Sequence, residues 1–264
     1  MNYLEAVILG LLQGLTEFLP VSSSGHLVIA QYFFGVEQPG ITLEVMVHLG
    51  TLLSIIWVFR ADLIALVNGF IVQSEERRLL LLLIMGIIPT GFMGIIGKSF
   101  FTGIFDSPLV AGFMLLITGF IVLAISMINI NVKKIKDMGI SDALVIGIFQ
   151  GIAIIPGISR SGSTILGALW RGLERETAVR YSFLLAIPAI AGAALIESQD
   201  ILDNIGSITL AGPNILAMLT AFVSGIFAIK IFVNLLNRGK FNYIAYYCWI
   251  MGTLTVLFSM ARVV

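Results

Sequence analysis

Residues 13–26 read QGLTEFLPVSSSGH, and this stretch decides the fold because it places polar groups inside an otherwise apolar run. Gln13, Glu17 and His26 occur there together with three consecutive serines. In lipid such groups are costly, since an acidic side chain at mid-membrane costs about 2.5–3.5 kcal/mol on a helix-insertion scale. We therefore expect another part of the chain to meet this stretch and compensate its polar groups.

A second copy of the pattern predicts that compensating segment, because residues 150–163 read QGIAIIPGISRSGS. The copies differ in charge: the first has Glu17 and His26, and the second has Arg160. Glycines and prolines that interrupt apolar segments at corresponding positions of two halves indicate broken helices that meet near the bilayer midplane. The positions that the copies share are Gln13 and Gln150, Gly14 and Gly151, Ser22 and Ser159, Ser24 and Ser161, and Gly25 and Gly162.

The composition indicates a polytopic membrane protein whose main partner is lipid. Of the 264 residues, 58% are hydrophobic and only 11% are charged, and the mean hydropathy is +1.04, which excludes an ordinary soluble domain. The 15 basic and 15 acidic side chains balance, so nothing favours nucleic-acid binding. The N-terminal run has Glu5 and no Lys or Arg, unlike a cleavable signal peptide, and the single cysteine, Cys248, excludes an intramolecular disulfide.

Two segments are interrupted too early to cross a bilayer. Residues 4–35 and 142–172 are apolar but broken in the middle, and each half is shorter than the roughly 20 residues that a spanning helix needs. We expect each to form a re-entrant helix-loop-helix hairpin. Six uninterrupted spans are predicted at residues 42–60, 79–97, 109–130, 181–198, 213–236 and 243–261.

The fold class expected is therefore an all-α polytopic membrane protein built as an inverted-topology repeat. Three spans separate the two hairpins, and an odd number makes them enter from opposite faces. One membrane domain would contain a first repeat at 1–130 and a second at 142–262.

The basic residues predict the orientation, because cytoplasmic loops collect Lys and Arg. Both termini and the entrance of the first hairpin are then expected outside, in a plasma (inner) membrane, with the site opening to the extracytoplasmic face. The crowded side carries Arg60, Arg77, Arg78, Lys133, Lys134, Lys136, Arg171, Arg175, Arg180, Arg238 and Lys240, whereas the other side has Lys98 and Arg262.

Gln13 and Glu17 lie four residues apart, on one face of a helix. Their oxygen atoms suit a hard cation such as Mg²⁺ or Ca²⁺, which takes one or two carboxylates together with substrate phosphate. The alternative is a structural ion pair between Glu17 and Arg160, and both arrangements are compatible with the sequence.

The serines of both copies stand where a helix should begin, so they are expected to cap it and to form a site for phosphate oxygens with the helix N-terminus. Caps without a bound phosphate are the plainer interpretation of the same pattern. The residues expected to line this site are Ser22, Ser24, Gly25, Ser159, Ser161, Gly162, Ser163 and Thr164.

Histidine and arginine supply the remaining chemistry. His26 is suited to act as a base on Ser23, as the nucleophile, or as an acid toward the leaving group, with a packing role as the alternative. Arg160 has a planar fork of donors that matches a diphosphate and stabilises charge in a transition state. Glu44 and His48, one helical turn apart in the first span, are expected to support the site from outside it.

At these residues the chain resembles the undecaprenyl-diphosphate phosphatase family, also known as bacitracin-resistance proteins. The resemblance covers the whole chain in length and span pattern. Its specific part is the family's (E/Q)xxxE pattern at Gln13 and Glu17, together with the stretches LPVSSSGH and PGISRSGST.

The resemblance implies a membrane hydrolase that removes the terminal phosphate of a C55 polyprenyl diphosphate and so recycles a lipid carrier for peptidoglycan and cell-wall synthesis. It implies Mg²⁺ or Ca²⁺ dependence and assigns the catalytic positions to Glu17, Ser23, His26 and Arg160, with Gln13 on the metal side. Gln13 takes the neutral option of its pair, which removes one carboxylate from the ligand set. A homo-oligomer is compatible with this class.

Two other functions fit parts of the pattern. A polyprenyl-phosphate or anion transporter, or flippase, would use the same inverted-repeat architecture. A type-2 phosphatidate phosphatase would need an upstream Lys/Arg-Pro element and a later histidine with an acidic partner, whereas this chain has only His26 and His48. Phosphate release separates the enzyme from the transporter.

Overall fold

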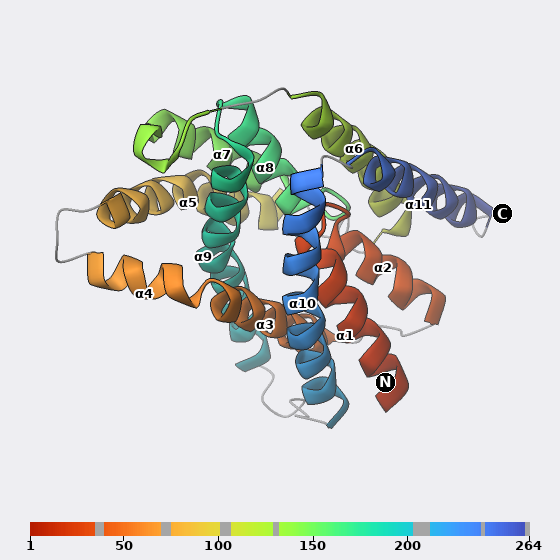
Figure 1. The fold of residues 1–264 in the computed structure, drawn as a ribbon. Helices are drawn as coiled ribbons and strands as arrows, with labels where there is room; N and C mark the ends of the chain where they lie inside the picture. Colours follow the sequence, from red (N-terminus) through yellow and green to blue (C-terminus); the bar gives the residue numbers. More distant parts are fainter. Residues whose placement is uncertain are drawn as a thin grey trace.

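The computed structural model describes residues 1–34, 40–69, 75–100, 107–128, 132–202, 212–238 and 241–261. Within these ranges the regular structure is α-helical, apart from a short 3-10 turn at Ile135–Asp137 and an isolated bridge between Lys133 and Leu173. The helices, drawn in Figure 1, are α1 (Tyr3–Phe18), α2 (Ser23–Phe34), α3 (Gly40–Val58), α4 (Arg60–Gly69), α5 (Glu75–Phe100), α6 (Pro108–Met127), α7 (Ile140–Ile152), α8 (Arg160–Trp170), α9 (Arg175–Leu202), α10 (Gly212–Arg238) and α11 (Asn242–Ala261).

Five of the six predicted spans are confirmed as helices that are long and apolar enough to cross a membrane, namely α5, α6, α9, α10 and α11. The sixth prediction, residues 42–60, is only partly right. Helix α3 ends at Val58, and the chain turns by 70° into α4, so this region qualifies as a span only if the bent pair is taken together.

Helix α4 was not predicted: it lies between the predicted spans 42–60 and 79–97, where no helix was expected. Its position has a physical reason. Asp62 in its first turn forms an ion pair with Arg180 of α9, at 2.5 Å, and both side chains are partly exposed. This contact holds the start of α4 at the charged side of the molecule.

Both predicted interruptions occur as helix-loop-helix hairpins. In the first hairpin α1 ends at Phe18 and α2 begins at Ser23. In the second hairpin α7 ends at Ile152 and α8 begins at Arg160. These bounds agree with the predicted segments 4–35 and 142–172 to within two residues. That the hairpins enter and leave the bilayer on one side stays a prediction.

The first helix of each hairpin, α1 or α7, packs closely on a long helix from the other half of the chain. Figure 1 shows α1 beside α10, and α7 packs in the same way on α5. The contact uses matched glycines, since a Cβ on Gly10 would collide with the carbonyl oxygen of Ala217, and one on Gly147 would collide with the carbonyl oxygen of Gly86. Gly10 and Gly147 occupy equivalent positions of the two sequence copies.

A hydroxyl group on the long helix donates to the equivalent glycine carbonyl in each of these two helix contacts. Ser224 of α10 donates to the carbonyl of Gly10 at 3.5 Å, and Thr90 of α5 donates to the carbonyl of Gly147 at 3.0 Å. Because short side chains and close backbones recur at both contacts, the two hairpins are supported by equivalent packing.

The loops between the hairpin helices are braced by α6 and α11, which lie side by side (Figure 1). Thr118 of α6 donates to the carbonyl of Gly157 at 2.7 Å, and the thiol of Cys248 in α11 lies 3.8 Å from the carbonyl of Pro20. Pro20 and Gly157 are again equivalent positions. The sequence gives no periodic signal for either brace.

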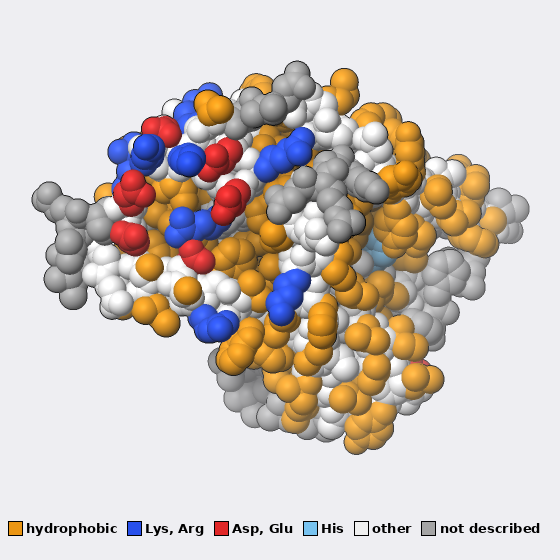
Figure 2. Space-filling view, in the orientation of Figure 1, with side chains coloured by type: hydrophobic (Ala, Val, Ile, Leu, Met, Phe, Trp, Pro, Cys, Tyr) orange, Lys and Arg blue, Asp and Glu red, His pale blue; other side chains and the backbone are white. Residues whose placement is uncertain are grey.

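Charged side chains gather on one side of the molecule, over α5, α7 and the start of α9 (Figure 2). Asp142 is buried there and accepts from Lys133 Nζ and from Arg171 Nε, both at 2.7 Å. Burial alone would raise the pKa of Asp142, but the hydrogen bonds from Lys133, the Gly139 N–H and Arg171 outweigh it, and the pKa lies below its usual value. The described part of the predicted cytoplasmic face is thus tied together by ion pairs.

We predict that Asp142→Asn lowers the free energy of unfolding by about 1–2 kcal/mol, the range for lost charge-assisted hydrogen bonds discounted for the exposure of both cations. Thermal unfolding in detergent measures the loss. Because the folded pKa is depressed, the carboxylate stabilises the protein above the unfolded pKa and stops doing so as the pH falls through the folded one. The difference between wild type and variant should therefore be constant near neutral pH and shrink below about pH 4.

Candidate active site

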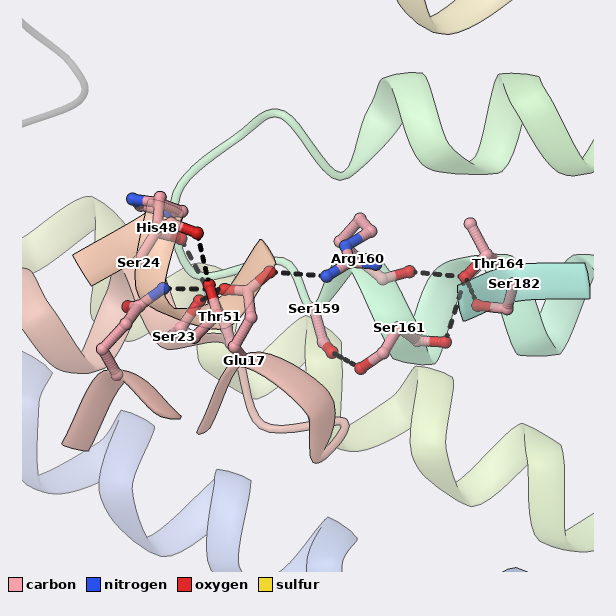
Figure 3. A network of polar contacts seen from close by, with 12 residues as sticks. Glu17, Ser23, Ser24, His48, Thr51, Ser159, Arg160, Ser161, Thr164 and Ser182 are labelled. Carbon is pink, nitrogen blue, oxygen red and sulfur yellow. Dashed lines mark hydrogen bonds and ion pairs between the residues drawn. The ribbon is translucent and has the colours of Figure 1, made fainter. Parts of the chain in front are cut away.

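The two loops meet at an ion pair between Glu17 and Arg160. The carboxylate oxygen Oε1 of Glu17 lies 2.5 Å from Nη2 of Arg160, and the side chains are only 7% and 14% exposed. Figure 3 shows the pair at the centre of a polar network that runs from α1 and α2 to α8. The predicted convergence of the acidic and the basic hairpin is confirmed.

The second oxygen of the Glu17 carboxylate is held from its own hairpin. Gln13 donates its Nε2 to Oε2 at 3.0 Å, as the four-residue spacing predicts, and the Ser23 hydroxyl donates to the same oxygen. Ser23 and Arg160 are the first residues of α2 and α8 and are equivalent in the two sequence copies. Equivalent positions therefore bind one carboxylate from two sides.

Two buried polar atoms beside this carboxylate have no hydrogen-bond partner among the described residues. One is Nη1 of Arg160, a donor, and the other is Oε1 of Gln13, an acceptor. A buried unpaired polar atom costs free energy, so its presence in a site indicates a group that binds there. The donor suits an anion and the acceptor suits a cation.

The capping roles predicted for the serines are confirmed in both halves. Ser22 Oγ accepts from the N–H of Gly25 at 3.4 Å, and Ser159 Oγ accepts from the N–H of Gly162 at 3.1 Å. Each cap also pairs with a second serine, Ser24 at 3.3 Å in the first half and Ser161 at 3.2 Å in the second. The positive ends of α2 and α8 are thereby directed toward the region of Glu17.

The glycines of the two hairpins allow the loops to interlock. A Cβ on Gly25 would lie 3.0 Å from Cα of Gly157, and one on Gly162 would lie 3.3 Å from Cβ of Pro20. A larger residue at Gly25 would separate the hairpins and with them the charged pair. Both glycines, predicted as lining residues, thus act through close packing.

His26 does not contact Ser23 through a hydrogen bond. Its Nδ1 lies 2.7 Å from the carbonyl of Ser22, and its Nε2 lies 2.7 Å from the hydroxyl of Tyr247 in α11. Both ring nitrogens are therefore engaged, which does not support the expected role as base on Ser23 or as nucleophile in this arrangement. Tyr247 was not predicted, because a tyrosine among the aromatic residues of an apolar helix carries no sequence signal for a site.

His48 lies closer to the acidic centre than predicted. Figure 3 shows it and Thr51, both in α3, at the end of the network that also holds Ser23 and Ser24, and it interacts electrostatically with Glu17. Its Nδ1 lies 2.7 Å from the carbonyl of Glu44, the normal partner one helical turn earlier. The carboxylate of Glu44 accepts a weak hydrogen bond from Gln31 at 3.4 Å, so Glu44 supports α2 and not Glu17.

The remaining predicted residues lie in the second half. Thr164 bonds to the carbonyl of Arg160 at 2.9 Å and to the hydroxyl of Ser182 in α9, which fixes the first turn of α8. The Ser163 hydroxyl is buried without a partner among the described residues. Gln150, the counterpart of Gln13, donates to Thr90 of α5 at 3.1 Å, and its Oε1 is buried without a partner among the described residues.

A metal ion would find a sparse set of ligands here. No group of three or more His, Cys, Asp and Glu side chains suited to a metal occurs in the described ranges. Glu17 offers one carboxylate, and the unpaired Oε1 of Gln13 lies on the same helix face. One carboxylate and a neutral oxygen fit Mg²⁺ or Ca²⁺ when phosphate and water complete the shell.

Comparison with known proteins gives a consistent match over nearly the full chain. Residues 6–254 match the family model described as bacitracin resistance protein BacA. The undecaprenyl-diphosphatase of Alkaliphilus metalliredigens is 42% identical over 98% of this chain and 100% of its own length. The proteins of the same name from Halothermothrix orenii, at 44% identity, and Methanosphaera stadtmanae, at 40%, each cover 98% of this chain and 99% of their own length.

We predict that Glu17→Gln lowers the free energy of unfolding by about 3 kcal/mol, because it leaves Arg160 buried without a counter-charge. Thermal unfolding in detergent measures this loss. Glu17→Gln combined with Arg160→Met should recover a large part of it, since the unpaired charge is then gone. Equal stability of wild type and Glu17→Gln would contradict the importance of the pair.

Proposed function

The chain belongs to the bacitracin resistance protein BacA family, and from this premise we propose that it is an undecaprenyl-diphosphatase, a membrane hydrolase that converts undecaprenyl diphosphate into the monophosphate and inorganic phosphate. This reaction recycles the lipid carrier of cell-wall synthesis and accounts for resistance to bacitracin. The observation that carries the proposal for the site is the chain of contacts from Ser23 through Glu17 to Arg160.

Binding of the diphosphate head follows from the unpaired donor of Arg160. Its Nη1 is buried and free to donate to a phosphate oxygen, while Nη2 stays on Glu17. The capped N-termini of α2 and α8 add backbone N–H groups and the positive ends of two helix dipoles. A dianionic phosphate thus meets one fixed cation and two helix ends, and the apolar helices around them suit the polyprenyl tail.

Ser23 is the nucleophile that this geometry favours, because its hydroxyl already donates to Glu17. Its Oγ attacks the terminal phosphorus, and its proton passes to Oε2 of Glu17. The bond from phosphorus to the bridging oxygen breaks, and undecaprenyl phosphate leaves with that oxygen and the electron pair. Arg160 balances the charge that grows on the phosphate oxygens.

Water completes the reaction. A water oxygen attacks the phosphorus of phosphoserine, the bond from phosphorus to Oγ breaks, and Oγ recovers its proton from Glu17. Inorganic phosphate leaves with the water oxygen, so one water molecule is consumed per diphosphate. Glu17 ends ionised and paired with Arg160 again.

Gln13 and Glu17 would hold the divalent cation of this reaction. A bound Mg²⁺ or Ca²⁺ supplies Lewis-acid stabilisation of phosphate oxygens. The unpaired Oε1 of Gln13 supports this assignment. The neutral amide also keeps the net charge of the centre low, with one carboxylate against one guanidinium.

The equivalent packing of the hairpins supports an inverted repeat with halves at 1–130 and 142–262. In this arrangement the charged face over α5 and α7 lies in the cytoplasm. Both termini and the entrance to the site then lie outside, where a carrier diphosphate is released. Of the basic residues that predict this orientation, Lys240 and Arg262 lie outside the described ranges, as do the side chains of Lys98 and Arg238.

We predict that purified protein releases inorganic phosphate from undecaprenyl diphosphate in detergent with Mg²⁺. Ser23→Ala should lower the rate by at least about 100-fold, because it removes the attacking atom. Ser126→Ala is a matched control, since that hydroxyl donates to a carbonyl of its own helix, Leu123, at 2.6 Å. Phosphate release is measured over time, and binding of the lipid is measured separately.

The result separates the rival functions. Intact protein that binds the lipid and releases no phosphate under varied divalent ions would favour a carrier over an enzyme. If phosphate release continues at the same rate in the presence of a chelator, only the metal assignment is refuted and the phosphatase function stands. Full activity of Ser23→Ala would exclude Ser23 as nucleophile.

We also predict the topology from single cysteines in a Cys248→Ala background. A cysteine at Asn2 should react with an impermeant maleimide added to intact cells, whereas one at the exposed Lys136 should react only after permeabilisation. The reverse pattern would place the charged face outside the cell.

A further inference from the structure

Tyr247 makes a two-part contact with His26 that the reaction above does not use. Its hydroxyl lies 2.7 Å from Nε2 of the imidazole, and the two rings are stacked with centroids 5.6 Å apart and planes 6° from parallel. Tyr247 comes from α11, in the second half of the chain, and His26 from α2, in the first. The contact therefore joins distant elements with defined geometry.

The hydrogen bonds fix the tautomer of His26. Nδ1 faces the carbonyl of Ser22 at 2.7 Å, and a carbonyl only accepts, so Nδ1 carries the proton. In the neutral ring Nε2 is then an acceptor, and the Tyr247 hydroxyl is its donor. Stacking and the hydrogen bond together leave the imidazole one orientation.

Ser22 needs this support because its backbone is strained. Its φ is +67°, and it is the one non-glycine residue with positive φ in the described ranges. This left-handed conformation is unfavourable for a serine by about 1–2 kcal/mol. The carbonyl of Ser22 accepts from the His26 ring and, at 3.3 Å, from the His26 N–H, so the histidine holds the turn that directly precedes Ser23.

A neighbouring residue braces the same loop. The thiol of Cys248, next to Tyr247 in α11, lies 3.8 Å from the carbonyl of Pro20. The second hairpin has no equivalent of the imidazole contact: Ser163 occupies the position of His26, and its buried hydroxyl has no partner among the described residues. The contact between an imidazole and a tyrosine is thus specific to the loop that carries Ser23.

We propose that Tyr247 is a positioning residue, which acts through His26 to hold the strained turn at Ser22 and so keeps the Ser23 hydroxyl on Glu17. This inference rests on the proposed phosphatase function, in which that hydroxyl attacks phosphorus. It explains why both nitrogens of a site histidine face away from the nucleophile.

Tyr247→Phe tests the proposal, because it keeps the stacked ring and removes the hydroxyl. The kcat for phosphate release should fall about three- to tenfold, as expected for one lost hydrogen bond, while KM changes less than about twofold. Tyr246→Phe is the matched control, since Tyr246 is adjacent in α11 but packs on Trp249, with ring centroids 5.9 Å apart. An unchanged kcat in Tyr247→Phe would overturn the proposal.

A double-mutant cycle tests whether Tyr247 acts through His26. In a His26→Leu background, Tyr247→Phe should cause little further loss, because leucine offers the hydroxyl no acceptor. Losses that multiply would mean that Tyr247 acts independently of His26 and would overturn the proposal.

A spectroscopic readout is independent of turnover. The chain has two histidines, so ¹⁵N-histidine labelling with His48→Gln for assignment isolates the ring nitrogens of His26. In Tyr247→Phe the Nε2 resonance should move to the position of an acceptor without a hydrogen bond, and Nδ1 should stay protonated. An unmoved Nε2 resonance would overturn the proposal, whereas absent phosphate release by wild type would refute the phosphatase function and leave this contact measurable.

Discussion

The structure depends on one constraint: a carboxylate and a guanidinium that are buried together must stay in contact. Removing two charges from water costs several kcal/mol for each ion, and only close pairing with further hydrogen bonds offsets this. Glu17 meets the requirement with contacts to Arg160, Gln13 and Ser23. Gln13 lies one turn before Glu17 in α1, whereas Ser23 and Arg160 are the first residues of α2 and α8. The broken hairpins are therefore the means by which the two charges reach one another.

The duplicated sequence made much of this predictable. A motif that recurs with one charge in each copy requires the copies to meet, and five spans followed from apolar length alone. That a serine of each copy caps a helix followed from the place of the serines before apolar runs, and Ser22 and Ser159 take this role. These features are local in sequence or set by periodicity, and the sequence therefore carries them directly.

Other features could not be read from the sequence because they depend on contacts between distant residues. Helix α4 forms where Asp62 finds Arg180, a partner 118 residues away. Tyr247 meets His26 across 221 residues, and neither the tyrosine nor its neighbours has a pattern that marks it. The interaction of His48 with Glu17 likewise depends on how α3 packs against α1. The spacing between Glu44 and His48 in the sequence does not specify that packing.

The differences between the two hairpins explain how an equivalent pair of scaffolds forms one asymmetric centre. If both copies had the sequence of the first, a serine would stand at the position of Arg160, and Glu17 would be buried without a cation, at a cost of several kcal/mol. In the second copy the position of Glu17 is Ile154, whose side chain faces Gly94 of α5, and the position of Ser23 is Arg160. The first residue of α2 thus supplies a hydroxyl and the first residue of α8 supplies a cation, both to the same carboxylate. Because the scaffold is duplicated and the chemistry is not, one side of Glu17 can accept a proton while the other side keeps its charge balanced.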